Sequence, residues 1–199
     1  MKIIQFEKKY SEEIANLHSA SITTGFLSHL SINFLKSLYV AISKHPDSYI
    51  VIAIDEKEGV EGFIAGTTST TQMYRWVLKR YFLIFSTHLI KFIVCPKKLK
   101  NIFETLFYTK KDSSNSNNNI EAELLTIAVN KISRGKGIGR ELVKTLEDFF
   151  YDNSISHYKV VTYSKDPVSN AFYKSCGFQF SRSFNHHGNI LNEYVKTIS

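Results

Sequence analysis

The chain has 199 residues, of which 43% are hydrophobic and 14% aromatic, enough to bury the core of one domain. This composition excludes collagen-like and wholly disordered proteins, and no run of about 18 apolar residues predicts a membrane-spanning helix. The net charge of +7 is concentrated in residues 72–111, which hold nine lysines and arginines against a single acid, Glu104. Any acidic partner is therefore expected to meet this segment.

The first residues are charged too early for a secretory signal peptide, and the two cysteines, Cys95 and Cys176, are too few for a disulfide framework. Cys176 is expected to be a small buried hydrophobe, because no base is placed to activate it. We therefore expect a single cytoplasmic domain that spans residues 1–199.

The first half of the chain predicts a series of short strands and helices. They are a strand at 2–6, helices at 11–20 and 31–43 capped by Ser11 and Ser31, and strands at 48–54 and 60–67. From residue 72 to 94, apolar residues recur at helical spacing, and Pro96 can begin another helix that ends near residue 108. We interpret 72–110 as a helical insert and the polar stretch 111–119 as a mobile loop.

The second half predicts a more regular alternation of strands and helices. Its elements are a strand at 121–129, a helix that ends near 151, a strand at 157–163, a helix from Asp166-Pro167 to Gly177, and a hairpin of 178–184 with 190–198.

Residues 134–139, Arg-Gly-Lys-Gly-Ile-Gly, join the apolar strand to an amphipathic helix. Glycines allow backbone N–H groups to converge, and a helix N-terminus adds partial positive charge, so the segment suits a pyrophosphate. Lys136 and Arg140 add charge. The spacing differs from a Walker loop and from the dinucleotide fingerprint. Taken alone, the segment is also compatible with a glycine-rich turn that binds nothing.

Two segments together resemble the GNAT superfamily of acetyl-CoA-dependent N-acetyltransferases. Residues 128–139 (AVNKISRGKGIG) resemble its pyrophosphate motif. Residues 170–178 (NAFYKSCGF) resemble its Asn-x-x-x-Tyr-x-x-x-Gly-Phe segment, with two residues instead of three between Asn170 and Tyr173. The close match covers about residues 121–184. Lys131 and Ser133 depart from the usual proline and aromatic. The resemblance implies an α/β fold of the α+β type: a mixed, mostly antiparallel central sheet flanked by helices.

The resemblance also implies a site for acetyl-CoA. The strand at 121–129 would separate from its neighbour, and the pantetheine arm would bond to its backbone like an added strand. The N–H of Ile127 would polarise the thioester carbonyl, and Asn170 would bond the pantetheine arm. The implied cofactor-binding residues are Ile127, Ala128, Val129, Arg134, Gly135, Lys136, Gly137, Ile138, Gly139, Arg140, Asn170 and Tyr173.

Tyr173 and Glu123 are the candidate catalytic residues. The resemblance places the Tyr173 hydroxyl near the sulfur as general acid; an ordinary core tyrosine is the alternative. Strand alternation predicts that Glu121, Glu123, Leu125, Ile127 and Val129 share one face. Glu123 lies six residues before Val129, where the histone acetyltransferase branch has its catalytic glutamate, and burial would raise its pKa. The alternative is that both glutamates are solvated.

The predicted reaction is direct transfer of an acetyl group to a primary amine of a small molecule or peptide. The segment at 21–26, between His18 and His29, is expected to border the acceptor, or to be a plain helix connection. No metal is expected, because His186-His187 has no second ligand cluster. The insert is expected to cover the core; a peripheral membrane contact or a homodimer contact is less favoured, and no nucleic-acid motif is present. The alternative function is a non-catalytic CoA-binding, membrane or protein interaction module.

Overall fold

The computed structural model describes residues 1–22, 30–93, 120–186 and 188–198, with the backbone alone for 82–93. The strands are β1 (Lys2–Gln5), β2 (Ser48–Ile54), β3 (Val60–Thr67), β4 (Glu123–Val129), β5 (His157–Tyr163), β6 (Gln179–His186) and β7 (Asn189–Thr197). The helices are α1 (Ser11–Ser21), α2 (Ile32–Ser43), α3 (Thr70–Ile93), α5 (Ile138–Asp152) and α6 (Pro167–Ser175), with 3-10 turns η1 (Lys8–Tyr10) and η4 (Lys131–Ser133).

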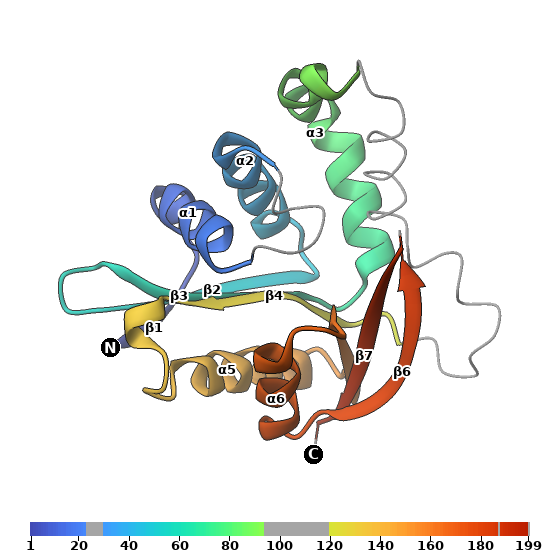
Figure 1. The fold of residues 1–199 in the computed structure, drawn as a ribbon. Helices are drawn as coiled ribbons and strands as arrows, with labels where there is room; N and C mark the ends of the chain where they lie inside the picture. The colour runs from blue at the N-terminus through green and yellow to red at the C-terminus, as the bar shows by residue number, and fades with distance from the viewer. Residues whose placement is uncertain (23–29, 94–119, 187, 199) are drawn as a thin grey trace.

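The strands form one sheet in the order β1-β2-β3-β4-β5-β7-β6. Every neighbouring pair is antiparallel except β4 and β5, which are parallel. Helices α1, α2 and α3 lie on one side of the sheet, and α5 and α6 lie on the other (Figure 1). The predicted fold, a mixed and mostly antiparallel sheet flanked by helices, is therefore confirmed.

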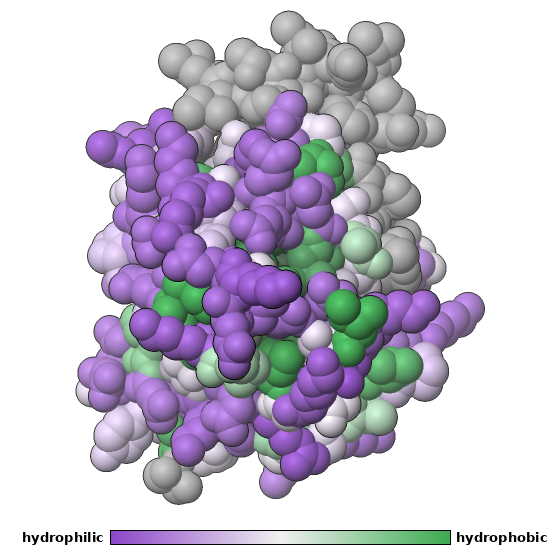
Figure 2. Space-filling model, turned by 90° about the vertical axis from the view of Figure 1, so that its left-hand side faces the viewer, coloured by the Kyte–Doolittle hydropathy of each residue, from purple (hydrophilic) through white to green (hydrophobic). Residues whose placement is uncertain are grey.

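Each face of the sheet has its own hydrophobic core, because successive residues of a strand point to opposite faces. In β3, Phe63 packs in the core beneath α1, α2 and α3, whereas Ile64 packs in the core beneath α5. Both side chains are fully buried, and burying one such side chain contributes about 1.5–3 kcal/mol. On the face seen in Figure 2, hydrophilic residues predominate and hydrophobic ones form separate small patches.

Two of the three predicted helix caps, Ser31 and Asp166, are present in the structure, and the third, Ser11, is not. Ser31 caps α2, because its Oγ accepts a hydrogen bond from the N–H of Phe34 at 3.2 Å. Asp166 caps α6 by accepting from Val168 and Ser169. The prediction that Ser11 caps α1 is wrong: η1 leads directly into the helix, so Ser11 is its first residue and Tyr10 occupies the cap position without a side-chain bond.

The first part of the predicted insert is the long helix α3. The helix predicted from Pro96 to residue 108, the loop at 111–119 and Cys95 lie outside the described residues. So does most of the segment at 21–26 expected to border the acceptor. Among the described helices, none combines the length and hydrophobicity needed to cross a membrane.

Candidate active site

Strands β4 and β5 pair only where β4 begins. The paired positions are Glu123 with Lys159 and Leu124 with Val160, and beyond them the two strands separate. Strand β5 continues instead along β7 through to Tyr163, which pairs with Leu191. Residues 126–129 of β4 therefore have β3 on one side and no paired strand, among the described residues, on the other.

The backbone of Ile127 and Val129 points into this separation. The N–H of Asn130 donates to the carbonyl of Glu61 on β3 at 2.8 Å. Because backbone groups alternate in direction along a strand, residues 127 and 129 face the opposite edge. The carbonyl of Val129 accepts from Nε of Arg134 at 3.1 Å. The backbone groups of Ile127 are left for an extended ligand to pair with.

The glycine-rich loop leaves the N-terminus of α5 open. Gly135 (φ +80°) and Gly137 (φ +83°) adopt left-handed conformations, and a Cβ built on either glycine would meet nothing within 4 Å. Gly137 occupies the cap position of α5, where no side chain caps the helix. The N–H of Arg140 donates to the carbonyl of Gly137 at 3.0 Å, whereas the N–H groups of Ile138 and Gly139 have no partner among the described residues. They lie beside the exposed side chains of Lys136 and Arg140, which is an arrangement that binds phosphate groups.

Three further residues predicted to bind the cofactor, Ala128, Ile138 and Gly139, pack inside the protein instead of facing open space. Gly139 lies against α6, since a Cβ there would stand 3.0 Å from Cε2 of Phe172. Ile138 and Ala128 are buried in the cores on opposite sides of the sheet. Gly139 and Ile138 can offer a ligand only their backbone, whereas the backbone of Ala128, which alternates with residues 127 and 129, faces β3. The open edge, the open loop and the uncapped helix together fit a ligand with an extended amide arm and a diphosphate, as coenzyme A has.

Asn170 is 9% exposed, and its amide is bonded entirely within the protein. Its Nδ2 donates to the carbonyls of Tyr163, at 2.8 Å, and Asp166. Its Oδ1 accepts from Nδ2 of Asn192 at 2.8 Å and from the hydroxyl of Tyr194 at 2.7 Å. Sequence reasoning did not identify Asn192 or Tyr194, because no motif marks residues on the last strand.

Tyr173 lies one turn after Asn170 on α6 and is 7% exposed. Its ring packs against Phe172, Phe178 and Tyr194. Burial raises the pKa of its phenol above the ordinary value, with smaller contributions from Asp166 and Cys176. The hydroxyl therefore stays protonated at neutral pH, and it makes no hydrogen bond to any residue that the structure describes.

A β-bulge in β4 decides which way Glu123 points. Ala65 of β3 is opposite Thr126, but the next residue, Gly66, is opposite Leu124, so Leu125 is an extra residue. Leu124 accordingly lies in the core beneath α5, whereas Ala128, four residues later, lies in the core beneath α1, α2 and α3.

The prediction that Glu121, Glu123, Leu125, Ile127 and Val129 share one face is therefore wrong. Leu125 packs in the core beneath α1, α2 and α3, and Ile127 and Val129 pack in the core beneath α5. By alternation, Glu123 faces the α1–α3 side with Leu125.

The surroundings of Glu123 favour its neutral form. Desolvation raises the pKa of its carboxyl to about 7; the charge of Lys159 opposes this rise and that of Glu193 adds to it. Glu193 is itself paired with Arg182 on β6, at 3.1 and 3.2 Å. A carboxyl group with a pKa near 7 can exchange protons at neutral pH, as a general base must.

His18 lies near the end of α1, and residues 23–29, which follow, are not described by the structure. The side chain of His18 is buried against Tyr39 in the core beneath α1, α2 and α3. Its Nδ1 shares a hydrogen bond with the hydroxyl of Tyr39, and its Nε2 has no partner among the described residues. Desolvation lowers the pKa of His18 to about 4, so it is uncharged at neutral pH. Across the described part of the chain, no three His, Cys, Asp or Glu residues group as metal ligands do.

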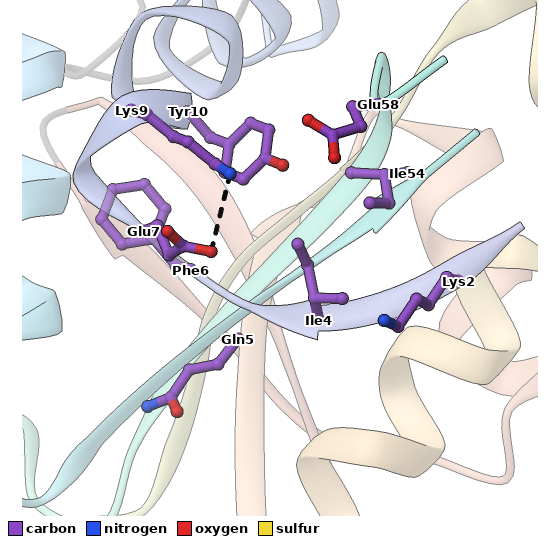
Figure 3. Close-up of a pocket in the computed structure, with 9 residues that line it drawn as sticks. All are labelled: Lys2, Ile4, Gln5, Phe6, Glu7, Lys9, Tyr10, Ile54 and Glu58. Atoms are coloured by element: carbon purple, nitrogen blue, oxygen red, sulfur yellow. Dashed lines mark ion pairs between the residues drawn. The ribbon is translucent and has the colours of Figure 1, made fainter. Parts of the chain in front are cut away.

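A separate hollow of about 450 Å³ lies at the far edge of the sheet, beside β1. Figure 3 shows it lined by β1, the following turn, and Ile54 and Glu58, with an ion pair of 3.8 Å between Lys9 and Glu7. Strands β2 and β3 separate β1 from β4. No residue of the two sequence motifs lines this hollow.

Comparison with known families gives a match across most of the chain. The model of the family described as "Acetyltransferase (GNAT) family" matches residues 12–178. This range includes β4, the glycine-rich loop and α6. A comparison with curated protein sequences found no match.

Solved structures share the fold at low sequence identity. The ribosomal-protein-S18-alanine N-acetyltransferase from Escherichia coli is similar with a TM-score of 0.61 and 12% identity, over 100% of this chain and 94% of that chain. A chimera of the spermidine N-acetyltransferase SpeG from Vibrio cholerae and hSSAT is similar with a TM-score of 0.58 and 13% identity, over 99% and 96%.

A third similar structure was solved with a ligand. The streptothricin acetyltransferase from Bacillus anthracis, described as putative, was solved in complex with acetyl coenzyme A. It is similar with a TM-score of 0.51 and 13% identity, over 81% of this chain and 68% of that chain.

Proposed function

The chain belongs to the acetyltransferase (GNAT) family, and we propose that Tyr173 and Glu123 perform the proton transfers of its reaction. The family consists of acyltransferases that use acetyl-CoA, and the chain is accordingly an N-acetyltransferase. Acetyl-CoA supplies an acetyl group activated as a thioester.

The observation that carries the proposal is that the glycine-rich loop joins the unpaired edge of β4 to the uncapped N-terminus of α5. The carbonyl of Ile127 and the N–H of Val129 would bond the amides of the pantetheine arm. The N–H groups that follow Gly137 would hold the pyrophosphate, with Lys136 and Arg140 adding charge. The N–H of Ile127 would also polarise the acetyl carbonyl.

Tyr173 is proposed to donate a proton to the departing sulfur. Its hydroxyl is protonated, is bonded to no described residue, and belongs to the helix that follows the separated end of β5. Positioned acid catalysis contributes about 10²–10⁴-fold to a rate. A phenol that already donated to a protein group would be less suited to this role.

Glu123 is proposed to accept the proton of the attacking amine, directly or through water. An amine attacks only in its uncharged form, whereas free alkylamines carry a proton at neutral pH. A carboxyl with a pKa of about 7 takes up that proton more readily than an ordinary one. Glu123 faces the side of the sheet that α1, α2 and α3 cover, so the acceptor would approach from that side.

The acceptor is proposed to be a primary amine of a small molecule or a peptide. Two of the similar structures are named as N-acetyltransferases of a ribosomal-protein-S18 alanine and of spermidine. A panel containing spermidine, an alanine-initiated peptide and a lysine-containing peptide tests both classes. The measured signal is release of free CoA thiol from acetyl-CoA.

The expected result is amine-dependent thiol release that saturates with acetyl-CoA. A chain that binds acetyl-CoA in calorimetry but releases no thiol with a broad range of primary amines would instead be a binding module.

A further inference from the structure

The amide of Asn170 has no bonding capacity left for a ligand. A primary amide donates two hydrogen bonds and accepts two. Here both donors are used by the carbonyls of Tyr163 and Asp166, and both acceptor positions by Asn192 and Tyr194. Rotating the amide by half a turn would place its oxygen against the carbonyls of Tyr163 and Asp166, which can only accept, so this orientation is the one that the surroundings allow.

The four bonds join three elements of the fold at one point. Tyr163 is the last residue of β5, at the end that separates from β4. Asp166 caps the first turn of α6 with its carboxylate. Asn192 and Tyr194 belong to β7, which pairs with β5 along its whole length. The position of the first turn of α6 therefore depends on side chains from the far side of β5.

The same group of residues is also in contact with Tyr173, through the ring of Tyr194. The rings of Tyr173 and Tyr194 lie 6.4 Å apart between centroids, and Tyr173 follows Asn170 by three residues on one helix. Tyr194 is 1% exposed and makes a single hydrogen bond, to Asn170, among those described. If that bond is removed, the amide loses one of the two donors that hold its oxygen, and the turn of α6 is free to shift.

We propose that Asn170, Asn192 and Tyr194 are positioning residues that fix the place of the Tyr173 hydroxyl beside the β4–β5 separation. Asn170 thus acts through the helix it anchors and not as a ligand of the pantetheine arm. This inference rests on the proposed function, in which Tyr173 is the acid. Displacement of a catalytic group by about 1 Å can cost 10²-fold in rate, so loss of one anchoring bond is expected to cost about 10-fold.

The test compares Tyr194→Phe with Tyr158→Phe. Tyr158 is a matched control: it is equally buried on the adjacent strand, and its hydroxyl bonds Glu147 at 2.6 Å on α5. Turnover is measured with acetyl-CoA and the fastest amine among spermidine, an alanine-initiated peptide and a lysine peptide. Acetyl-CoA affinity is measured by calorimetry, and the thermal midpoint of the free protein by circular dichroism.

Tyr194→Phe is expected to lower kcat about 10-fold and to leave the acetyl-CoA Kd within about threefold of wild type. Tyr158→Phe is expected to shift the thermal midpoint comparably and to leave kcat unchanged. In a Tyr173→Phe background, Tyr194→Phe should cost nothing further, because the group it positions is already absent. Asn170→Ala should reproduce the fall in kcat.

Two results separate this inference from the function it rests on. If Tyr173→Phe is impaired but Tyr194→Phe keeps wild-type kcat, the positioning role is overturned and the acid role of Tyr173 stands. If Tyr173→Phe itself keeps wild-type kcat, the acid role is overturned and the inference falls with it. An Asn170→Ala variant that loses acetyl-CoA affinity, beside a normal Tyr194→Phe, would identify Asn170 as a ligand.

Discussion

Gly139 and Phe172 hold helices α5 and α6 in direct contact, since a Cβ on Gly139 would lie 3.0 Å from the Phe172 ring. Helix α5 begins at the glycine-rich loop, and α6 carries Tyr173. The third glycine of the loop thus sets the distance between the proposed pyrophosphate site and the proposed acid. The absence of a side chain at Gly139 allows the two helices to come into contact, whereas Gly135 and Gly137 face open space.

Gly139→Val is expected to be destabilised because the added side chain overlaps the Phe172 ring. Overpacking of this kind costs about 2 kcal/mol, which lowers the Tm of a chain of this size by roughly 4–8 °C. Differential scanning calorimetry measures the shift. Lys144→Val, at an exposed position of the same helix, is the control and should shift Tm by less; equal shifts would show that the close contact does not constrain α5.

Gly137→Glu is expected to abolish acetyl-CoA binding, because it places a carboxylate at the uncapped N-terminus of α5 where the pyrophosphate would lie. Gly188→Glu is a matched control, since Gly188 also has a left-handed φ, +81°, and open space around it. Both variants carry the same backbone strain, but only the first should lose affinity, by at least about 100-fold in calorimetry. Equal affinities would remove the loop from the donor site.

Glu123→Gln is expected to lower kcat and to remove a rise of kcat with pH through about 7, the pKa of the carboxyl. Rate profiles from pH 5.5 to 9 measure this, with Glu121→Gln as the neighbouring control. A variant that keeps both the wild-type rate and the wild-type profile would exclude Glu123 as the base.

The same substitution should change stability in a pH-dependent way. The folded carboxyl has a pKa of about 7, against about 4.3 when unfolded. Between these values the folded state binds more protons, so the free energy of unfolding falls as pH rises. Glu123→Gln removes that fall, and at pH 8 it should be more stable than wild type by about 4 kcal/mol. Urea unfolding at pH 4 and 8 measures the difference, which should disappear at pH 4.

Tyr173→Phe is expected to reduce kcat by about 10²-fold with nearly unchanged acetyl-CoA affinity, because it removes the hydroxyl and keeps the ring packing. Since burial raises the pKa of Tyr173, the wild-type rate should show no loss from its ionisation up to pH 9. Single-turnover measurements ensure that the chemical step is observed. Wild-type rates in that assay would mean that the sulfur takes its proton from water.

The basic insert gives a prediction about membranes. Arg75, Lys79 and Arg80 are exposed on α3, and the Arg80 guanidinium lies 5.8 Å from the centre of the Trp76 ring. If the insert only covers the core, the protein should not co-sediment with phosphatidylserine vesicles, at low or moderate salt. Sedimentation at low salt that falls steeply as salt is raised would show an electrostatic lipid contact.

The sequence predicted the order of the elements well because their signals are local. Glycines, the cap at Asp166 and the apolar periodicity each act within a few residues, so β5 and α6 begin where the pattern predicted. The resemblance to the family added the separation of β4 from β5, which no periodicity reveals.

The wrong assignment of strand faces in β4 and the overlooked residues of β7 both depend on contacts between distant segments. The bulge at Leu125 arises from the register between β3 and β4, and a strict period of two assigns Ile127 to the wrong face. Tyr194 meets Asn170 across 24 residues of sequence. An alternating strand pattern indicates that Tyr194 is buried but not which polar group its hydroxyl meets.

The bulge at Leu125 also bears on the order in which two substrates bind. It turns Glu123 toward the α1–α3 layer, while the loop at the start of α5 belongs to the opposite layer. At the proposed sites, donor and amine would approach one strand from opposite sides, and neither would have to leave before the other enters. Initial rates measured against both concentrations should then give intersecting lines, the kinetic signature of a ternary complex, and not the parallel lines of an acetylated enzyme.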